Sequence, residues 1–217
     1  MVIMSENKSI TAYKQQLRDR IVETAMEAFS QRGIRAVKMD DIAQELGISK
    51  RTLYELYDNK EDLLCEGVRK KRALREADML ACVAKSDNVM DIILNVYRHK
   101  VEEFRQTGAQ FYADLVKYPQ VMALLEEYHQ SSHERTLDFF RRGISEGYFR
   151  ADIDYNIVSL LFDAIGYQIM SKQLYRQYSI EQLFYNLVFI SLRGFCTMRG
   201  VEALDQSLGL SGSNNNK

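Results

Sequence analysis

The chain has 217 residues, of which 46% are hydrophobic and 27% charged, with one proline and 11 glycines. This is the composition of a folded globular protein, and it excludes a collagen-like or intrinsically disordered chain. The net charge of −1 is unevenly divided: residues 1–75 hold 15 Lys and Arg against 12 Asp and Glu, and residues 76–217 hold 14 against 18, which permits a polyanionic partner for the first third without requiring one.

The first predicted helix ends at Gly33. Its apolar residues recur every four positions and therefore share one helical face, at Leu17, Ile21, Ala25 and Phe29. Gly33 follows the pattern and is expected to end the helix in a left-handed conformation. Residues 1–12 precede the pattern, and we predict that they form a flexible N-terminal arm.

Two short helices follow, with a turn between them. The apolar stripe of the first is Met39, Ile42, Ala43 and Leu46, and the second carries Leu53 and Leu56. Gly47 supplies the sharp turn, Ile48 can fill the small core between the helices, and Ser49 is a good N-cap for the second. Short helices joined in this way are typical of a helix-turn-helix, which we place at about residues 37–57.

The second of these helices has a face suited to DNA. On a helical wheel, Lys50, Arg51 and Tyr54 lie opposite Leu53 and Leu56. A helix fits the DNA major groove, where Arg bonds guanine O6 and N7, and the hydroxyls of Tyr54 and Thr52 can bond phosphates. The alternative is that this helix is an ordinary amphipathic surface helix. For Glu55 two roles stay open: it could accept from cytosine N4, or it pairs with Arg51 in the free protein.

The rest of the chain is also predicted to be helical. A fourth helix begins after Asp58 or Asn59 and runs past Leu80, and longer helices follow at about residues 87–106, 109–117, 119–147, 154–176 and 180–199. Residues 201–217 are expected to be a partly disordered tail. The predicted fold is therefore all-α, with a three-helix DNA-binding domain over 13–74 and a larger helical domain over 75–200.

The last two long helices are apolar around most of their circumference, so each must be buried on two sides. One side is expected to face its own domain and the other a second copy of the chain. The residues assigned to this dimer interface are Leu161, Ile165, Leu187, Ile190 and Gly194. The alternative is a central helix pair in a monomeric bundle.

The middle of the chain is rich in aromatic side chains that could line a ligand cavity or simply fill a core. The candidates for an apolar or aromatic small molecule are Phe104, Phe111, Tyr112, Tyr128, Phe140 and Tyr167.

Other kinds of site are not indicated. The three cysteines are far apart, and His129 and His133 lack further ligands, so neither a disulfide framework nor a metal site is predicted. No catalytic or nucleotide-binding motif occurs, and we expect neither an enzyme nor a cofactor. The N-terminus is too polar for a secretory signal and no membrane span is expected, so we predict a cytoplasmic protein.

The run from Tyr13 to about Leu74 resembles the N-terminal domain of TetR-type transcriptional regulators. The order and spacing match in Ile21-Val22-Glu23-Thr24-Ala25, Ala28-Phe29, Gly33-Ile34, Met39-Asp40-Asp41-Ile42-Ala43, Leu46-Gly47-Ile48-Ser49-Lys50, Thr52-Leu53-Tyr54, Tyr57 and Asn59-Lys60-Glu61-Asp62-Leu63-Leu64. The resemblance implies a homodimer, formed mainly by the last two long helices, that represses transcription and releases DNA when a small molecule enters the body.

The resemblance also assigns residue roles. It implies that Lys50, Arg51, Thr52 and Tyr54 contact DNA, that Lys60 contacts a phosphate at the start of the fourth helix, and that Tyr57 packs beside the DNA backbone. Two positions depart from the family pattern. Lys38 stands where many members have a capping threonine, although a lysine there can still reach a phosphate. Arg51 stands where many have glycine, so the operator is not inferred by analogy.

The sequence thus predicts a one-component repressor that binds a palindromic operator in double-stranded DNA as a homodimer. One alternative is a transcriptional activator with the same DNA-binding domain. Two others are an all-helical carrier of small molecules without DNA binding and a structural dimer whose head binds protein.

Overall fold

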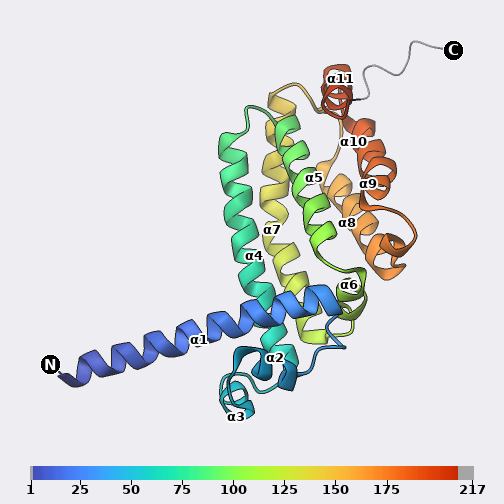
Figure 1. The fold of residues 1–217 in the computed structure, drawn as a ribbon. Coiled ribbons are helices and arrows are strands. Elements are labelled where there is room, and N and C mark those ends of the chain that lie inside the picture. Colours follow the sequence, from blue (N-terminus) through green and yellow to red (C-terminus); the bar gives the residue numbers. More distant parts are fainter. Residues whose placement is uncertain (1, 210–217) are drawn as a thin grey trace. The chain divides into compact units, whose positions relative to one another are not determined.

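The computed structural model describes residues 2–209, with side chains from residue 12 onward. This part of the chain is helical (Figure 1), and the all-α prediction is confirmed. The helices are α1 (Val2–Arg32), α2 (Met39–Leu46), α3 (Lys50–Tyr54), α4 (Lys60–Lys85), α5 (Val89–Gln106), α6 (Ala109–Leu115), α7 (Pro119–Ser145), α8 (Tyr155–Ser171), η1 (Leu174–Arg176), α9 (Ile180–Leu183), η2 (Phe184–Phe189), α10 (Ile190–Phe195) and α11 (Met198–Ser207).

The chain forms two compact units. The first contains the residues up to 75 together with 106–126, and the second contains 76–105 and the residues from 127 onward. The first boundary lies within one residue of the predicted division between 13–74 and 75–200. The segment 106–126, however, packs with the DNA-binding helices, whereas the sequence analysis placed it in the larger domain.

The segment 106–126 joins the first unit because α6 packs against the end of α1. Gly33 has a φ of +87°, and a Cβ atom there would lie 2.6 Å from Cγ of Gln110. The Gly108 N–H donates to the carbonyl of Ser30 at 2.8 Å. Asp114 accepts from the backbone N–H of Arg35 at 2.9 Å. These contacts join residues 77 to 79 positions apart, so no local pattern predicts them.

The core of the first unit is built from the predicted apolar faces. The four α1 residues of the helical stripe are buried, and so are Ile42 of α2, Leu53 of α3, and Leu63 and Leu64 of α4. Burying side chains of this size stabilises each by about 1.5–3 kcal/mol. The core therefore holds the short α3 in place, since five residues form too short a helix to be stable alone.

In the second unit, aromatic side chains dominate the core. Phe140 stacks on Tyr155 with ring centroids 4.6 Å apart, and Phe149 meets Phe195 edge-on at 5.3 Å. Gly143 permits this packing, because a Cβ atom there would lie 2.0 Å from the Phe149 ring. Such aromatic contacts contribute about 0.5–1.5 kcal/mol each beyond burial.

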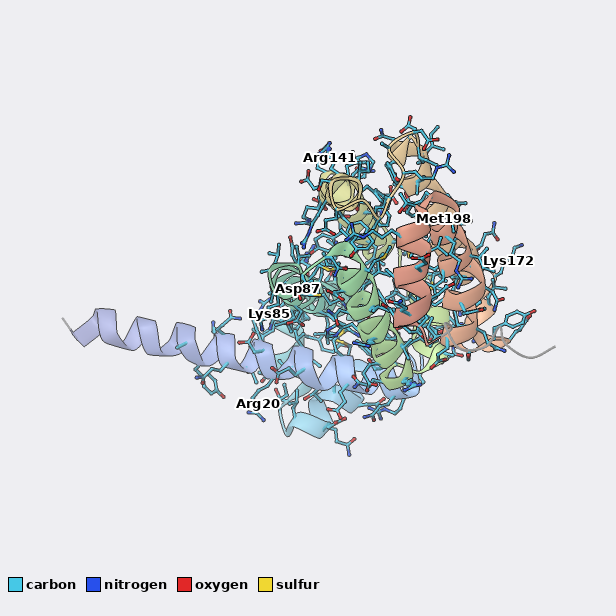
Figure 2. The ribbon with its side chains drawn as sticks, turned by 90° about the horizontal axis from the view of Figure 1, so that it is seen from above. Arg20, Lys85, Asp87, Arg141, Lys172 and Met198 are labelled. Atoms are coloured by element: carbon cyan, nitrogen blue, oxygen red, sulfur yellow. The ribbon has the colours of Figure 1, made fainter. Side chains whose placement is uncertain are left out.

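A clamp on α7 fixes the turn between α4 and α5, where Figure 2 labels Lys85 and Asp87. Arg142 donates to Glu146 at 2.6 Å and to the carbonyl of Ser86 at 3.0 Å. Glu146 in turn accepts from the backbone N–H of Val89 at 2.8 Å. The pair thereby satisfies backbone groups at the end of α4 and the start of α5.

The structure differs from the predicted elements at both ends. Residues 2–12 are helical, where a flexible arm was expected, because no glycine or proline interrupts the first 32 residues. The helix predicted over 180–199 contains the π-helix η2 and ends at Phe195. Extended backbone at Cys196 then forms a bridge with Phe149, and α11 follows with its Leu204 buried. Of the predicted tail 201–217, residues 210–217 lie outside the described residues.

Two further findings concern residues 2–209. None of their helices is both long enough and apolar enough to span a bilayer. The described His, Cys, Asp and Glu side chains, which begin at residue 12, form no cluster of three or more that could hold a metal ion. His129 instead places Nε2 3.0 Å from the Asp163 carboxylate.

Candidate DNA-binding site

The turn between α2 and α3 is built by Gly47 and Ser49. Gly47 adopts a φ of 65° and a ψ of 29°, a left-handed conformation that glycine takes at little cost. The next N–H, of Ile48, donates to the carbonyl of Ala43 at 3.0 Å. Ser49 Oγ accepts from the backbone N–H of Thr52 at 3.0 Å and caps α3 as predicted. These local bonds set the direction in which α3 leaves the turn.

The start of α2 is capped without a hydroxyl at position 38. The backbone N–H of Lys38 donates to a carboxylate oxygen of Asp41 at 2.8 Å. This bond is half of the usual capping arrangement, and Asp41 also favours the helix by its charge in the first turn. The Lys38 side chain stays exposed, as a phosphate contact requires.

The exposed face of α3 carries the predicted DNA contacts. Arg51 is 88% exposed and its Nε donates to Glu55 at 2.8 Å, so the predicted pairing in the free protein is confirmed. The Lys50 ammonium donates to Asp40, which raises the pKa of Lys50. Tyr54 is 47% exposed. Exposed ion pairs of this kind are weak, so both cations can exchange their partners for DNA.

Lys60 is held differently from the other cations. Its Nζ donates to the carbonyl oxygens of Ile34 and Val37, each at 2.8 Å, and so ties the start of α4 to the segment between α1 and α2. Burial lowers the pKa of Lys60. An ammonium has three donors, so one remains for a phosphate. The structure thus gives Lys60 a structural role that the sequence did not reveal.

Two of the residues predicted to contact DNA make contacts within the first unit. Tyr57 is only 4% exposed, and the Arg18 guanidinium lies 4.9 Å from its ring centroid. Tyr57 therefore packs inside the first unit, and its contact with DNA stays a prediction. The Thr52 hydroxyl lies 2.8 Å from Ser49 Oγ at the helix cap.

The six predicted ligand residues are divided between the two units, with Phe111 and Tyr112 in the first and the other four in the second. Phe111 is buried in the first unit, where its ring meets Tyr112 edge-on at 5.5 Å. Phe140 fills the aromatic core of the second unit, Phe104 packs on Tyr175, and Tyr167 is 70% exposed. None of the six lines the cavity between α5, the α9–η2 segment and α11.

An apolar face on α8 and α10 is left open to solvent. Leu161 is 47% exposed and Ile190 54% exposed, and Ile157 and Leu160 are each 65% exposed. Gly194 is exposed with open space where a Cβ would lie, whereas Ile165 and Leu187 are half-buried. The residues chosen for dimerisation thus lie on or beside an unpartnered apolar surface.

The first unit has a capped turn followed by a helix with an exposed cationic face, and a larger all-helical unit follows it. These features define the class of helix-turn-helix DNA-binding regulators. Residues 21–66 match the family described as bacterial regulatory proteins, tetR family. This segment spans the end of α1, the helix-turn-helix and the start of α4. The helix-turn-helix segment of this protein is therefore similar to the DNA-binding segment of that family.

Similarity to known proteins extends beyond this segment. The HTH-type transcriptional repressor KstR2 of Mycobacterium tuberculosis is 28% identical over 147 residues, which cover 65% of this chain and 73% of KstR2. The HTH-type transcriptional regulator UidR of Escherichia coli is 26% identical over 77% of this chain and 89% of UidR. The solved structure of a transcriptional regulator from Saccharomonospora viridis in complex with choline superposes with a TM-score of 0.66 at 22% identity, over 84% of this chain and 99% of that one.

Proposed function

We propose that this protein is a dimeric, cytoplasmic repressor that occupies a palindromic operator through α3 and releases it when a small molecule binds the second unit. The observation that carries the DNA-binding part is the exposed cationic face of α3, on which Arg51 is almost fully accessible. The repressor role and the ligand dependence draw on the relatives, because KstR2 is a repressor and the Saccharomonospora viridis regulator binds choline.

On DNA, α3 would lie in the major groove. Arg51 would leave Glu55 and donate two parallel bonds to guanine O6 and N7. This exchange is favourable because an exposed ion pair contributes little, whereas the guanine edge offers two acceptors in a fixed geometry. Lys50, Lys38 and the free donor of Lys60 would bind phosphates, which set position but not sequence.

The dimer is supported by the open apolar face of α8 and α10. A two-fold axis through this face buries the same side chains of both copies. Two DNA-binding heads in a dimer read half-sites one DNA turn apart, about 34–36 Å centre to centre, and the operator is then a palindrome. A reporter gene behind such an operator tests the sign of regulation, because a repressor lowers its expression and an activator raises it.

Replacing Arg51 by alanine is expected to relax base preference. The ratio of affinities for the operator and for a single-base variant at the contacted guanine should fall about tenfold, while non-specific affinity changes less. Fluorescence anisotropy with both duplexes measures the ratio. Arg32→Ala, which removes an exposed cation from α1, is the control. A ratio unchanged in Arg51→Ala would show that α3 does not read this base.

Replacing Lys60 by alanine is expected to weaken binding to all sequences alike. The slope of log affinity against log salt should decrease in magnitude by about 1, because one phosphate contact is lost. The melting temperature should also fall, since two bonds to backbone carbonyls disappear. Affinity is therefore compared at a temperature where both proteins are folded. Lower stability with an unchanged salt slope would assign Lys60 a purely structural role.

A further inference from the structure

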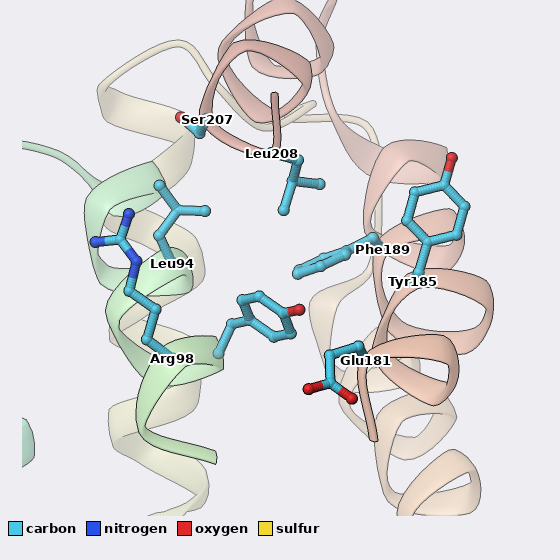
Figure 3. A pocket seen from close by; sticks show the side chains of 8 residues that line it. Leu94, Arg98, Glu181, Tyr185, Phe189, Ser207 and Leu208 are labelled. Atoms are coloured by element: carbon cyan, nitrogen blue, oxygen red, sulfur yellow. The ribbon is translucent and has the colours of Figure 1, made fainter. Parts of the chain in front are cut away.

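The second unit contains a cavity of about 280 Å³ between α5, the α9–η2 segment and the end of α11. Figure 3 shows Leu94, Phe189 and Leu208 pointing toward one another across this space, with Glu181 below them and Arg98 along α5. Ligand pockets commonly hold about 300–1,000 Å³. The cavity therefore suits a molecule smaller than a drug, such as one ring with a short chain.

The apolar wall of the cavity contains aromatic rings in contact with one another and is partly made by the π-helix. Tyr97 meets Phe189 edge-on with ring centroids 5.1 Å apart, and it also contacts Phe184 at 5.3 Å. Phe184 and Phe189 are the first and last residues of η2. π-Helical turns are rare and occur frequently at functional sites. Here the turn contributes Phe189 and the half-exposed Tyr185 to the lining.

Of the charged side chains at the cavity, the Arg98 guanidinium is available to bind a ligand. Glu181 accepts from Arg105 at 2.8 Å, so its charge is already neutralised. Hydrogen bonds from its own backbone N–H and from Arg105 lower the pKa of Glu181. Arg98, also at the cavity, makes no hydrogen bond or ion pair within the described part of the chain. Because Arg105 neutralises Glu181, the charge of Arg98 is the one left without a counter-charge among the described lining residues, and it favours an anion.

We propose that this cavity binds a small organic carboxylate, with its apolar body against Leu94, Phe189 and Leu208 and its carboxylate on Arg98. A guanidinium and a carboxylate form two parallel charge-assisted bonds, which fixes the orientation of the ligand. The release of the operator by such a ligand rests on the proposed function. The binding of the ligand to the cavity does not depend on the proposed function.

The test compares 3-phenylpropanoate with 3-phenylpropylamine, which differ mainly in the charge of the head group. Equilibrium dialysis of the purified full-length chain should show one saturable site for the acid and affinity at least about tenfold lower for the amine. The affinity of the variant Arg98→Gln for the acid should be about tenfold lower than that of the wild type. Arg141→Gln, on the surface of α7 (Figure 2), should bind as the wild type does.

Preference for the amine, no saturable binding of the acid, or equal binding by Arg98→Gln would each overturn the proposed site. Circular dichroism melting curves of the two variants show whether each is folded, which is expected because both arginines are exposed. DNA binding is measured separately on the same protein. Retained DNA binding without ligand binding would contradict this site alone, and ligand binding without DNA binding would contradict the proposed function alone.

Discussion

The variant Leu161→Glu is expected to be monomeric at concentrations where the wild type is a dimer. In the proposed dimer, the two-fold axis would place the new carboxylate in the interface from both copies, and an uncompensated buried charge costs about 3–5 kcal/mol. The dimer dissociation constant should rise at least about a thousandfold. Operator affinity should fall with it, because a monomer binds only one half-site. Sedimentation velocity measures the first effect and anisotropy with the full operator the second.

The matched control is Leu80→Glu on α4. Leu80 is also a largely exposed leucine of the second unit, but it lies outside the α8–α10 face. This variant should stay dimeric and bind the operator. If Leu161→Glu also stays dimeric, or if both variants dissociate, the apolar face of α8 and α10 is not the dimer interface.

Replacing Asp114 by alanine is expected to lower the free energy of unfolding of the first unit by about 3 kcal/mol. The carboxylate is only 1% exposed and accepts from three donors: the Arg35 N–H at 2.9 Å, Gln110 Nε2 at 2.9 Å and Lys117 Nζ at 3.3 Å. The alanine leaves the Arg35 N–H without its acceptor and α6 without its link to the end of α1. Urea unfolding followed by circular dichroism measures the change.

The same carboxylate should make the free energy of unfolding of the first unit depend on pH. Burial alone would raise the pKa of Asp114, but the hydrogen bonds from Arg35, Gln110 and Lys117 outweigh it and lower the pKa below the usual value. A lowered pKa in the folded state means that the stabilisation is complete above about pH 4, the unfolded value, and is lost as pH falls through the folded value. The difference between wild type and Asp114→Ala should therefore shrink below about pH 4. Asp138→Ala, which removes an exposed carboxylate, should have the same stability as the wild type at each pH.

The helix-turn-helix was predictable from sequence because its signals are local. Gly47 forms the predicted turn between α2 and α3, and Ser49 is the N-cap of α3. The exposed face of α3 followed from helical periodicity, and the pairing of Arg51 with Glu55 followed from their spacing.

Features that depend on distant residues were not predictable. No pattern in 106–126 shows that Asp114 bonds Arg35, or that Lys60 bonds carbonyls about 25 residues earlier. The six aromatic candidates were chosen by residue type, which does not distinguish a core from a cavity. The spacing of Glu181, Tyr185 and Phe189 at every fourth position is a signal for one lining face of the cavity, although it does not reveal the π-helix that carries two of them.

The central claim is that this protein reads a specific DNA sequence as a dimer. The most direct test incubates purified protein, dialysed to remove small ligands, with sheared genomic DNA from its own source and sequences the retained fragments at two salt concentrations. We expect a palindrome with half-sites about one DNA turn apart to be enriched at both salt concentrations. Retention without a shared sequence, lost at the higher salt, would indicate only phosphate attraction and would contradict the claim.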